Sequence, residues 1–359
     1  MRPRIALSGP ESRSNLAAPD LALYRPSEGD LEPHILALLE DVAELEMARR
    51  RFGPFVRLCW PLVDPHPLAW APYLDILCGE LEAVTRGEVD ELVVCVPPGL
   101  GKSTICSVLW PAWELLADPA MGILGISNEE GLAARDSRRC RDLVRRPEYG
   151  RLVAHVATMT GKEPWKLDKS QWDKTDWNTD RGGYRYARGV GGRVTGRRAR
   201  RIIVDDAMDA SAILDEPGAV ARRAAAVADY YDVVLASRLD ARGARVVVQQ
   251  RLASCDLAGR RLAAGARAVI LPLRADPTRA DRHPLDARAE GESLAPAVFG
   301  PEREAALRLA LGSKHAAAQL DQAPRAEFGE VFRREWLRHL AGDPRGWPAD
   351  EWAISADAA

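Results

Sequence analysis

The stretch "VVCVPPGLGKST", residues Val93–Thr104, joins a short apolar run to a glycine-rich turn. It ends in Gly101-Lys102-Ser103, the last part of the phosphate-binding pattern G-x-x-x-x-G-K-[ST]. The first glycine of that pattern would fall at position 96, which is Val96, and two prolines follow it. The stretch therefore predicts a buried strand, a tight turn and a helix, with one departure from the usual pattern.

The turn in this stretch can bind phosphate without the missing glycine. Backbone N–H groups at a turn and a helix start cradle phosphates, helped by the helix dipole, and Pro97 and Pro98 precede these donors. Lys102 would reach the β- and γ-phosphates and Ser103 would ligate Mg²⁺, so ATP and Mg²⁺ are the predicted cofactors. A plain Gly-Pro turn before a helix is the alternative. The predicted binding residues are Pro98, Gly99, Leu100, Gly101, Lys102, Ser103 and Thr104.

A second motif, "RRIIVDD" at residues 200–206, is an apolar run that ends in two carboxylates. Asp205 is placed to hold Mg²⁺, directly or through water. Asp206 would orient and activate the attacking water, which makes it the predicted general base. The alternative is an acidic pair that caps the next loop.

Short apolar runs separated by helical stretches predict the fold. Runs this apolar suit strands buried on both faces, as in a parallel sheet covered by helices. A Gly-bounded alternating stretch at 182–192 predicts a short hairpin or strand, and Pro111 should kink or end its helix. The predicted core strands are 92–96, 122–126, 202–204, 245–249 and 268–273. The predicted helices are 34–52, 103–116, 129–144 and 302–322.

Composition excludes several classes of protein. The six cysteines form no C-x-x-C pair, which argues against a zinc site or a disulfide framework, and no apolar run approaches the length of a membrane span. The net charge of −2 does not suit a globally basic nucleic-acid binder. Two local arginine runs remain, Arg135–Arg146 and Gly191–Arg201. The second either contacts DNA phosphates or is a solvated charge run.

With these motifs in this order, the chain resembles the large terminase subunit of tailed bacteriophages, the motor that packs DNA into the procapsid. The "PP-x-x-GKS" form of the loop, the run into "VDD" and the segment "VVVQQRLASCDLAG" (residues 246–259) carry the resemblance, which covers roughly residues 54–357. It implies an α/β P-loop NTPase (RecA/ASCE-like) with a mostly parallel central sheet flanked by helices and a small lid/linker subdomain. It also implies an ATPase that translocates double-stranded DNA.

The resemblance assigns further roles. An arginine in the helix after the second strand contacts the γ-phosphate in related motors; Arg138 is the best match, with Arg135 and Arg141 as alternatives. The coupling segment corresponds to Gln249, Gln250 and Arg251, which could instead make ordinary strand-end hydrogen bonds. Many such motors carry Glu at the position of Asp206, so the shorter side chain is a departure. Aromatic residues before the loop could stack on the base or simply pack; they are Phe55, Trp60, Trp70 and Tyr73.

The resemblance also implies partners and a domain plan. The partners are double-stranded DNA, the portal protein, the small terminase subunit and further copies of the chain in a ring, with no membrane contact. The expected location is the host cytoplasm, at the portal vertex of the procapsid during packaging. The expected plan is a loose or helical segment 1–53, a motor domain 54–273, a lid/linker subdomain 274–345 and the start of an RNase H-like nuclease domain 346–359.

The last residues, "ISADAA", resemble the first strand of the family's nuclease, with Asp357 as its first acidic metal ligand. A metal nuclease needs several converging carboxylates. We therefore expect ATPase activity without DNA cleavage from this chain. Two other interpretations remain: a helicase-like P-loop ATPase, and a non-catalytic, prophage-derived remnant that binds DNA or portal without turnover.

Overall fold

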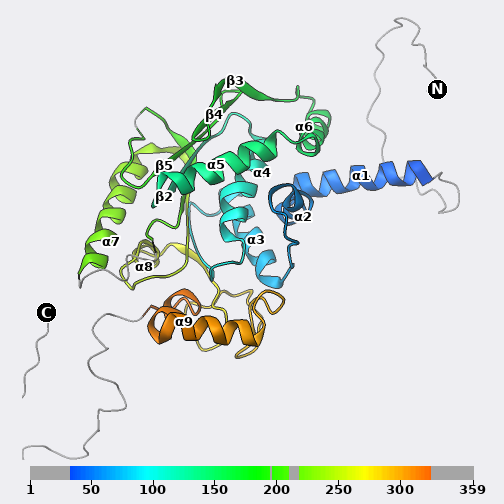
Figure 1. Ribbon diagram of the computed structural model, residues 1–359. Coiled ribbons are helices and arrows are strands. Elements are labelled where there is room, and N and C mark those ends of the chain that lie inside the picture. Colours follow the sequence, from blue (N-terminus) through cyan, green and yellow to red (C-terminus); the bar gives the residue numbers. More distant parts are fainter. Residues whose placement is uncertain (1–32, 195, 210–217, 325–359) are drawn as a thin grey trace, which may run out of the picture.

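The computed structural model describes residues 33–194, 196–209 and 218–324 (Figure 1). Asp357 and the segment 346–359 lie outside these residues. The α-helices are α1 Pro33–Arg50, α2 Phe52–Val63, α3 Pro72–Arg86, α4 Trp110–Ala117, α5 Glu130–Val144, α6 Pro147–Thr160, α7 Ala219–Asp229, α8 Leu257–Ala263 and α9 Pro301–Gln319. Two π-helical turns, η1 Thr104–Leu109 and η3 Tyr230–Leu235, and a 3₁₀ turn, η4 Ala236–Arg238, complete them.

Eight strands form one sheet in the order β3-β4-β5-β2-β6-β7-β1-β8. From β5 to β8 all neighbours are parallel, and β3 and β4 add an antiparallel edge. The mostly parallel sheet and its five predicted core strands are confirmed, and the alternating stretch at 182–192 is strand β5. The strands are β1 Glu91–Cys95, β2 Gly122–Ser127, β3 Leu167–Trp172, β4 Asp176–Thr179, β5 Tyr184–Gly189, β6 Ala199–Asp205, β7 Leu239–Gln249 and β8 Arg267–Ile270.

The sheet is buried on both faces, as its apolar strands predict. Alternate residues of β1 belong to different buried clusters: Leu92 and Val94 pack with α2–α6, whereas Val93 and Cys95 pack with α7 and α8. The loop after β8 and α9 pack on the first side, in the same cluster as the helices that cover it. Figure 1 shows α9 below the sheet and α1 projecting outward beyond α2.

The helix after the glycine-rich loop does not end at Pro111. A π-helical turn, η1, precedes the proline, and α4 begins at Trp110 with Pro111 in its first turn. Proline has no N–H and its ring collides with the carbonyl four residues earlier, so a proline inside a continuous helix distorts the turn before it. The expected kink therefore takes the form of a widened turn just before the proline.

A buried ion pair fastens this helix to the sheet. The Arg201 guanidinium on β6 donates to the Glu114 carboxylate of α4 at 2.7–3.0 Å, and both side chains are 5% exposed or less. Burial raises the pKa of Glu114, while the attraction of Arg201 opposes that shift. Such a pair fixes the relative position of its two elements, because either charge alone would be costly to bury.

We predict that Arg201→Met lowers the free energy of unfolding by about 3–5 kcal/mol, because it leaves the buried Glu114 carboxylate unpaired. Urea unfolding followed by circular dichroism measures the change. The matched control is Arg151→Met, which breaks the exposed pair with Asp41 and should cost less than about 1 kcal/mol. Equal losses for the two variants would contradict the role given to the buried pair.

Candidate nucleotide and metal site

The glycine-rich loop leaves β1 and turns directly into a helix. Gly99 and Gly101 have φ of +79° and +76°, a conformation that favours glycine. A Cβ at Gly101 would also lie 2.8 Å from the Trp60 ring, so glycine is required there for a second reason. The Ile105 N–H donates to the Gly101 carbonyl at 2.9 Å, and N–H groups before it belong to the helix start, where helical partners are lacking. The loop thus combines two left-handed glycines with the start of a helix, which is the arrangement on which the prediction of a phosphate cradle depends.

Two serines of the helix start hold the carboxylate at the end of β6. The Ser103 hydroxyl donates to Asp205 Oδ1 at 3.1 Å, and the Ser107 hydroxyl donates to Asp205 Oδ2 at 2.6 Å. Lys102 is 6% exposed and lies near enough to lower the pKa of Asp205. The structure therefore brings the predicted residues Lys102, Ser103 and Asp205 into one place.

The ionised form of the buried Asp205 carboxylate is unfavourable in the protein without nucleotide or metal. Burial, followed by the nearby Asp206 and Asp136 carboxylates, raises its pKa to about 7, against the opposing effects of Ser107 and Lys102. A divalent cation would offset this excess of negative charge. The described residues hold no group of three or more His, Cys, Asp or Glu side chains arranged for a metal. Mg²⁺ bound with a nucleotide needs only one or two protein oxygens, and Ser103 and Asp205 fit that requirement.

Asp206 has an unusual backbone. Its φ is +46°, in the left-handed region that costs a non-glycine residue on the order of 1–3 kcal/mol. Its N–H donates to the Val248 carbonyl at 2.8 Å, and its carbonyl accepts from the Asn128 N–H at 3.1 Å. These contacts with the ends of β7 and β2 fix the backbone of Asp206, whose side chain is half-buried.

The arginines of α5 take different positions. Arg138, the predicted γ-phosphate contact, is exposed. Arg139 instead reaches the loop: it donates to the Thr104 hydroxyl and to the Val63 carbonyl, both at 3.1 Å. Arg135 pairs with the buried Asp136 at 2.9 Å, and Arg141 pairs with Asp142 at 3.2 Å. In the described structure Arg139 is therefore the α5 arginine that hydrogen-bonds the helix start.

The coupling segment lies at the end of β7, next to β1. Gln249 is buried and pairs in register with Cys95, and Gln250 Oε1 is buried without a hydrogen-bond partner among the described residues. The side chain of Arg251 forms a buried ion pair with Asp256 at 3.0 Å. The backbone N–H of Arg251 donates to Gln322 Oε1 at 3.0 Å. Gln249 and Gln250 thus remain candidates for sensing a bound phosphate, whereas Arg251 connects the strand end to the segment after α9.

Three of the four aromatic candidates for base stacking, Trp60, Trp70 and Tyr73, line a pocket in the described structure. Phe55 is fully buried beside Phe52, and the Tyr73 hydroxyl donates to the Leu100 carbonyl at 3.0 Å. Trp60 and Trp70 line a pocket of about 430 Å³, and Trp60 is the ring that touches Gly101. This pocket therefore lies beside the glycine-rich loop.

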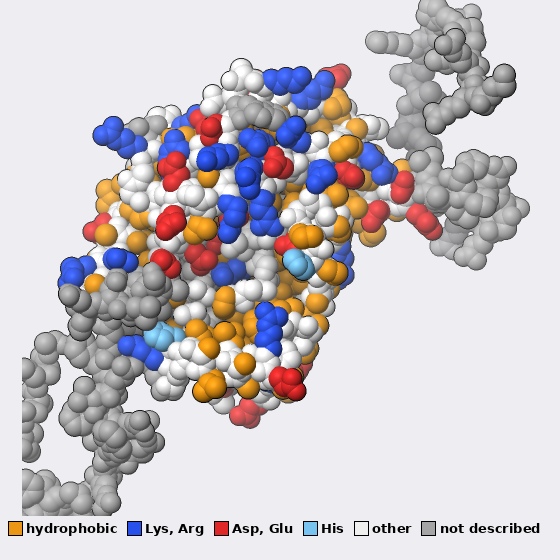
Figure 2. Space-filling view, viewed as in Figure 1, with side chains coloured by type: hydrophobic (Ala, Val, Ile, Leu, Met, Phe, Trp, Pro, Cys, Tyr) orange, Lys and Arg blue, Asp and Glu red, His pale blue; other side chains and the backbone are white. Residues whose placement is uncertain are grey.

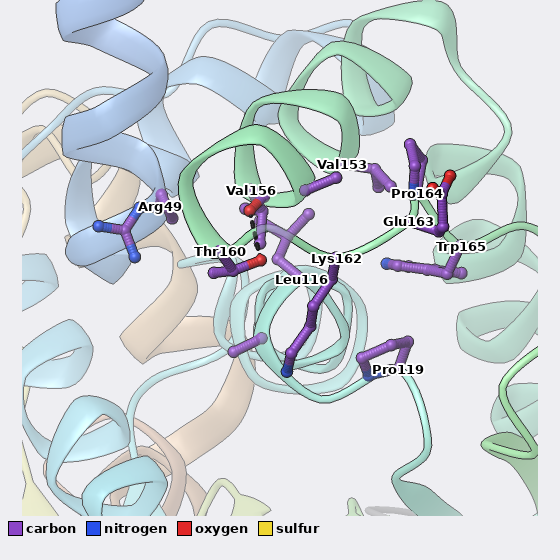
Figure 3. A pocket seen from close by; sticks show the side chains of 12 residues that line it. Arg49, Leu116, Pro119, Val153, Val156, Thr160, Lys162, Glu163, Pro164 and Trp165 are labelled. Carbon is purple, nitrogen blue, oxygen red and sulfur yellow. Dashed lines mark hydrogen bonds between the residues drawn. The ribbon is translucent and has the colours of Figure 1, made fainter. Parts of the chain in front are cut away.

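Another pocket lies at the far end of the helix that follows the loop. It has a volume of about 150 Å³ and lies between the ends of α4 and α6, lined by Leu116, Val153 and Trp165 among others (Figure 3). The Trp165 indole N–H is buried there without a partner among the described residues. Its position separates it from the candidate site.

Ser107, Arg139 and the conformation of Asp206 were not found from the sequence. Ser107 lies four residues after Ser103, so the two hydroxyls share a helix face, and that spacing was an available signal. No described helix has both the length and the apolarity that crossing a membrane requires.

Comparison with known proteins identifies no family. No family model matches the chain, and no curated protein matches it. One similar solved structure is the large terminase ATPase domain of Thermus phage P74-26, with a TM-score of 0.28 and 15% identity. The similarity covers 52% of this chain and 65% of that chain. A likeness this weak does not decide function, so the functional argument rests on the site itself.

We predict that Asp205→Asn stabilises the nucleotide-free protein above neutral pH. Since the folded-state pKa of Asp205 is raised from 3.8 to about 7, the folded state binds more protons than the unfolded state between these values. Its stability therefore falls as pH rises from about 4 to 7. Relative to wild type, we expect Tm to be roughly 2–5 °C higher at pH 8 and similar at pH 4.

Thermal unfolding by calorimetry at several pH values, in EDTA, measures the effect. Asp142→Asn, an exposed change on α5, is the control and should leave the pH profile of Tm as in wild type. Parallel profiles for wild type and Asp205→Asn would show that the burial of this carboxylate has no energetic consequence.

Proposed function

We propose that the protein is an ATP-hydrolysing motor of the terminase large-subunit type, which translocates double-stranded viral DNA into a procapsid. The observation that carries the proposal is the hydrogen bond between Ser103 and Asp205, residues 102 positions apart, beside the buried Lys102. A hydroxyl and a carboxylate that meet next to a lysine, at a glycine-rich helix start, suit a magnesium nucleotide.

Each residue of the site then has a role. The N–H groups of Gly99–Thr104 would hold the phosphates, and Lys102 would neutralise their charge. Ser103 and Asp205 would hold Mg²⁺, which would offset the negative charge of the phosphates. Asp206 would accept a proton from the attacking water, and its fixed backbone supports such a role because strained residues often serve function.

An arginine of α5 would meet charge that develops on the γ-phosphate. Arg139 is a candidate for this role within one chain, because its guanidinium donates to the Thr104 hydroxyl at the start of the helix after the loop. Arg138 is exposed and would act on a neighbouring chain in a ring. The planar guanidinium suits either geometry, since its donors match phosphate oxygens.

A basic and aromatic surface around β5 supports DNA binding. Figure 2 shows Lys and Arg side chains gathered on the part of the visible face where α5, β5 and β2 lie in Figure 1. Arg188 stacks on Tyr186 at 4.1 Å, and Arg193 and Arg198 are exposed on the loop before β6. Exposed arginines of this kind attract the DNA backbone without regard to sequence. The portal protein, the small terminase subunit and a ring on the portal in the host cytoplasm complete the proposal by resemblance.

We predict that Lys102→Ala lowers ATPase turnover by about 10²–10³-fold, because it removes a positioned cation from the phosphates. Asp206→Asn should lower turnover by about 10²–10⁴-fold while ATP still binds, since only proton transfer is lost. Phosphate release measures turnover, and a fluorescent ATP analogue measures binding, with and without DNA.

Lys162→Ala, at an exposed lysine remote from the loop, is the matched control. Wild-type protein that hydrolyses no ATP with DNA and portal present would favour a non-catalytic remnant. Full activity in Lys102→Ala would place the catalytic site elsewhere.

We predict that Arg193→Ala with Arg198→Ala weakens binding to double-stranded DNA equally for unrelated sequences. The slope of log K against log salt concentration should become shallower by about one for each DNA phosphate that the variant no longer neutralises. Fluorescence anisotropy over a salt series measures both quantities. Arg242→Ala, an exposed change on β7, is the control and should leave the slope unchanged. An unchanged slope in the double variant would show that Arg193 and Arg198 do not contact DNA.

A further inference from the structure

The π-helical turn after the loop has a cause in the sequence. Proline offers no N–H, and in a helix its ring collides with the carbonyl four residues earlier, which for Pro111 is that of Ser107. The chain widens at η1, where the Trp110 N–H donates to the carbonyl of Ile105, five residues before it. Pro111 therefore cannot donate to the Ser107 carbonyl as an ordinary residue would.

Arg185 supplies the missing donor. Its Nη2 donates to the Ser107 carbonyl at 2.7 Å, from strand β5 on the sheet beneath the helix. The side chain is 1% exposed, and its Nε and Nη1 have no partner among the described residues. A Cβ at Gly125 would lie 3.3 Å from Nη2, so glycine on β2 leaves room for the guanidinium. A buried cation with one protein partner is costly, so this contact is not explained by stability alone.

The same serine also reaches the candidate metal site. The Ser107 hydroxyl donates to Asp205 Oδ2 at 2.6 Å, while Ser103 holds the other oxygen at 3.1 Å. If Ser103 turns its oxygen to a metal ion, Ser107 remains as the hydroxyl that orients the Asp205 carboxylate. The carbonyl and the hydroxyl of Ser107 are then both in use: Arg185 donates to the carbonyl, and Asp205 accepts from the hydroxyl.

We propose that Ser107 and Arg185 are positioning residues for the metal site, with Arg185 fixing the π-helical turn that aims Ser107 at Asp205. The proposal rests on the function proposed above. It assigns the turn a purpose, in keeping with the frequent occurrence of single π-helical turns at functional sites. Neither residue needs to touch nucleotide, so the effect should appear in the magnesium requirement of the enzyme.

The test measures ATPase rate against Mg²⁺ concentration for the whole chain. Ser107→Ala should raise the Mg²⁺ concentration for half-maximal rate about five- to tenfold, because the carboxylate loses a charge-assisted hydrogen bond. The rate at saturating Mg²⁺ should change by less than about twofold, and ATP binding in EDTA should match wild type. Ser237→Ala, which removes an exposed helical hydroxyl, should change none of these values.

Arg185→Lys tests the second half of the proposal. Arg185→Lys should raise the Mg²⁺ concentration for half-maximal rate, as Ser107→Ala does. In the double variant this concentration should be no higher than in the more affected single variant, because both residues act through the Asp205 carboxylate. If Arg185→Lys does not fold, the result with Ser107→Ala decides. An unchanged Mg²⁺ requirement in Ser107→Ala, or additive shifts in the double variant, would overturn the proposal. Wild-type protein without magnesium-dependent ATP binding would instead overturn the proposed function itself.

Discussion

The contact on which the rest of the site depends is the buried carboxylate of Asp205 between two serine hydroxyls. It joins the helix after the glycine-rich loop to strand β6, and the fold keeps it buried despite its repulsion by Asp206 and Asp136. The Arg201–Glu114 pair fastens the same helix to the same strand near their other ends. Two polar attachments thus set the position of the helix along β6, which apolar packing alone would leave less specific.

The order of the strands brings the remaining groups to this contact. Strand β7 lies between β1 and β6, so Gln249 pairs with Cys95 on one side while Val248 pairs with Asp205 on the other. Ligand sites in such sheets lie outside the carboxyl ends of the strands. The glycine-rich loop, the coupling segment and the two aspartates therefore meet at one edge, although the loop lies far from the others in the sequence.

Much of this arrangement follows from the sequence, because the signals are local. Apolar runs such as Leu92–Val96 predict strands buried on both faces, and the sheet contains a strand at each of the five predicted runs. Strands β3 and β4 were missed because their sequences, "LDKSQW" and "DWNT", are polar, and their register is irregular. Helical spacing does not separate Arg138 from Arg139, because both flank the buried stripe of α5. The packing of α5 against η1 decides which of them meets the loop.

The contact between Arg251 and Gln322 indicates that the folded core extends beyond the last strand of the sheet. Gln322 is buried with φ +53°, and the Leu273 N–H donates to the Leu320 carbonyl at 2.8 Å. Leu294, Phe299 and Leu320 share one apolar cluster with α2 and α3. A fragment that stopped at residue 273 would expose that cluster and leave the Arg251 N–H without its acceptor. Residues 274–324 thus pack into the same apolar core as the sheet, and the Arg251–Gln322 hydrogen bond joins them to the end of β7.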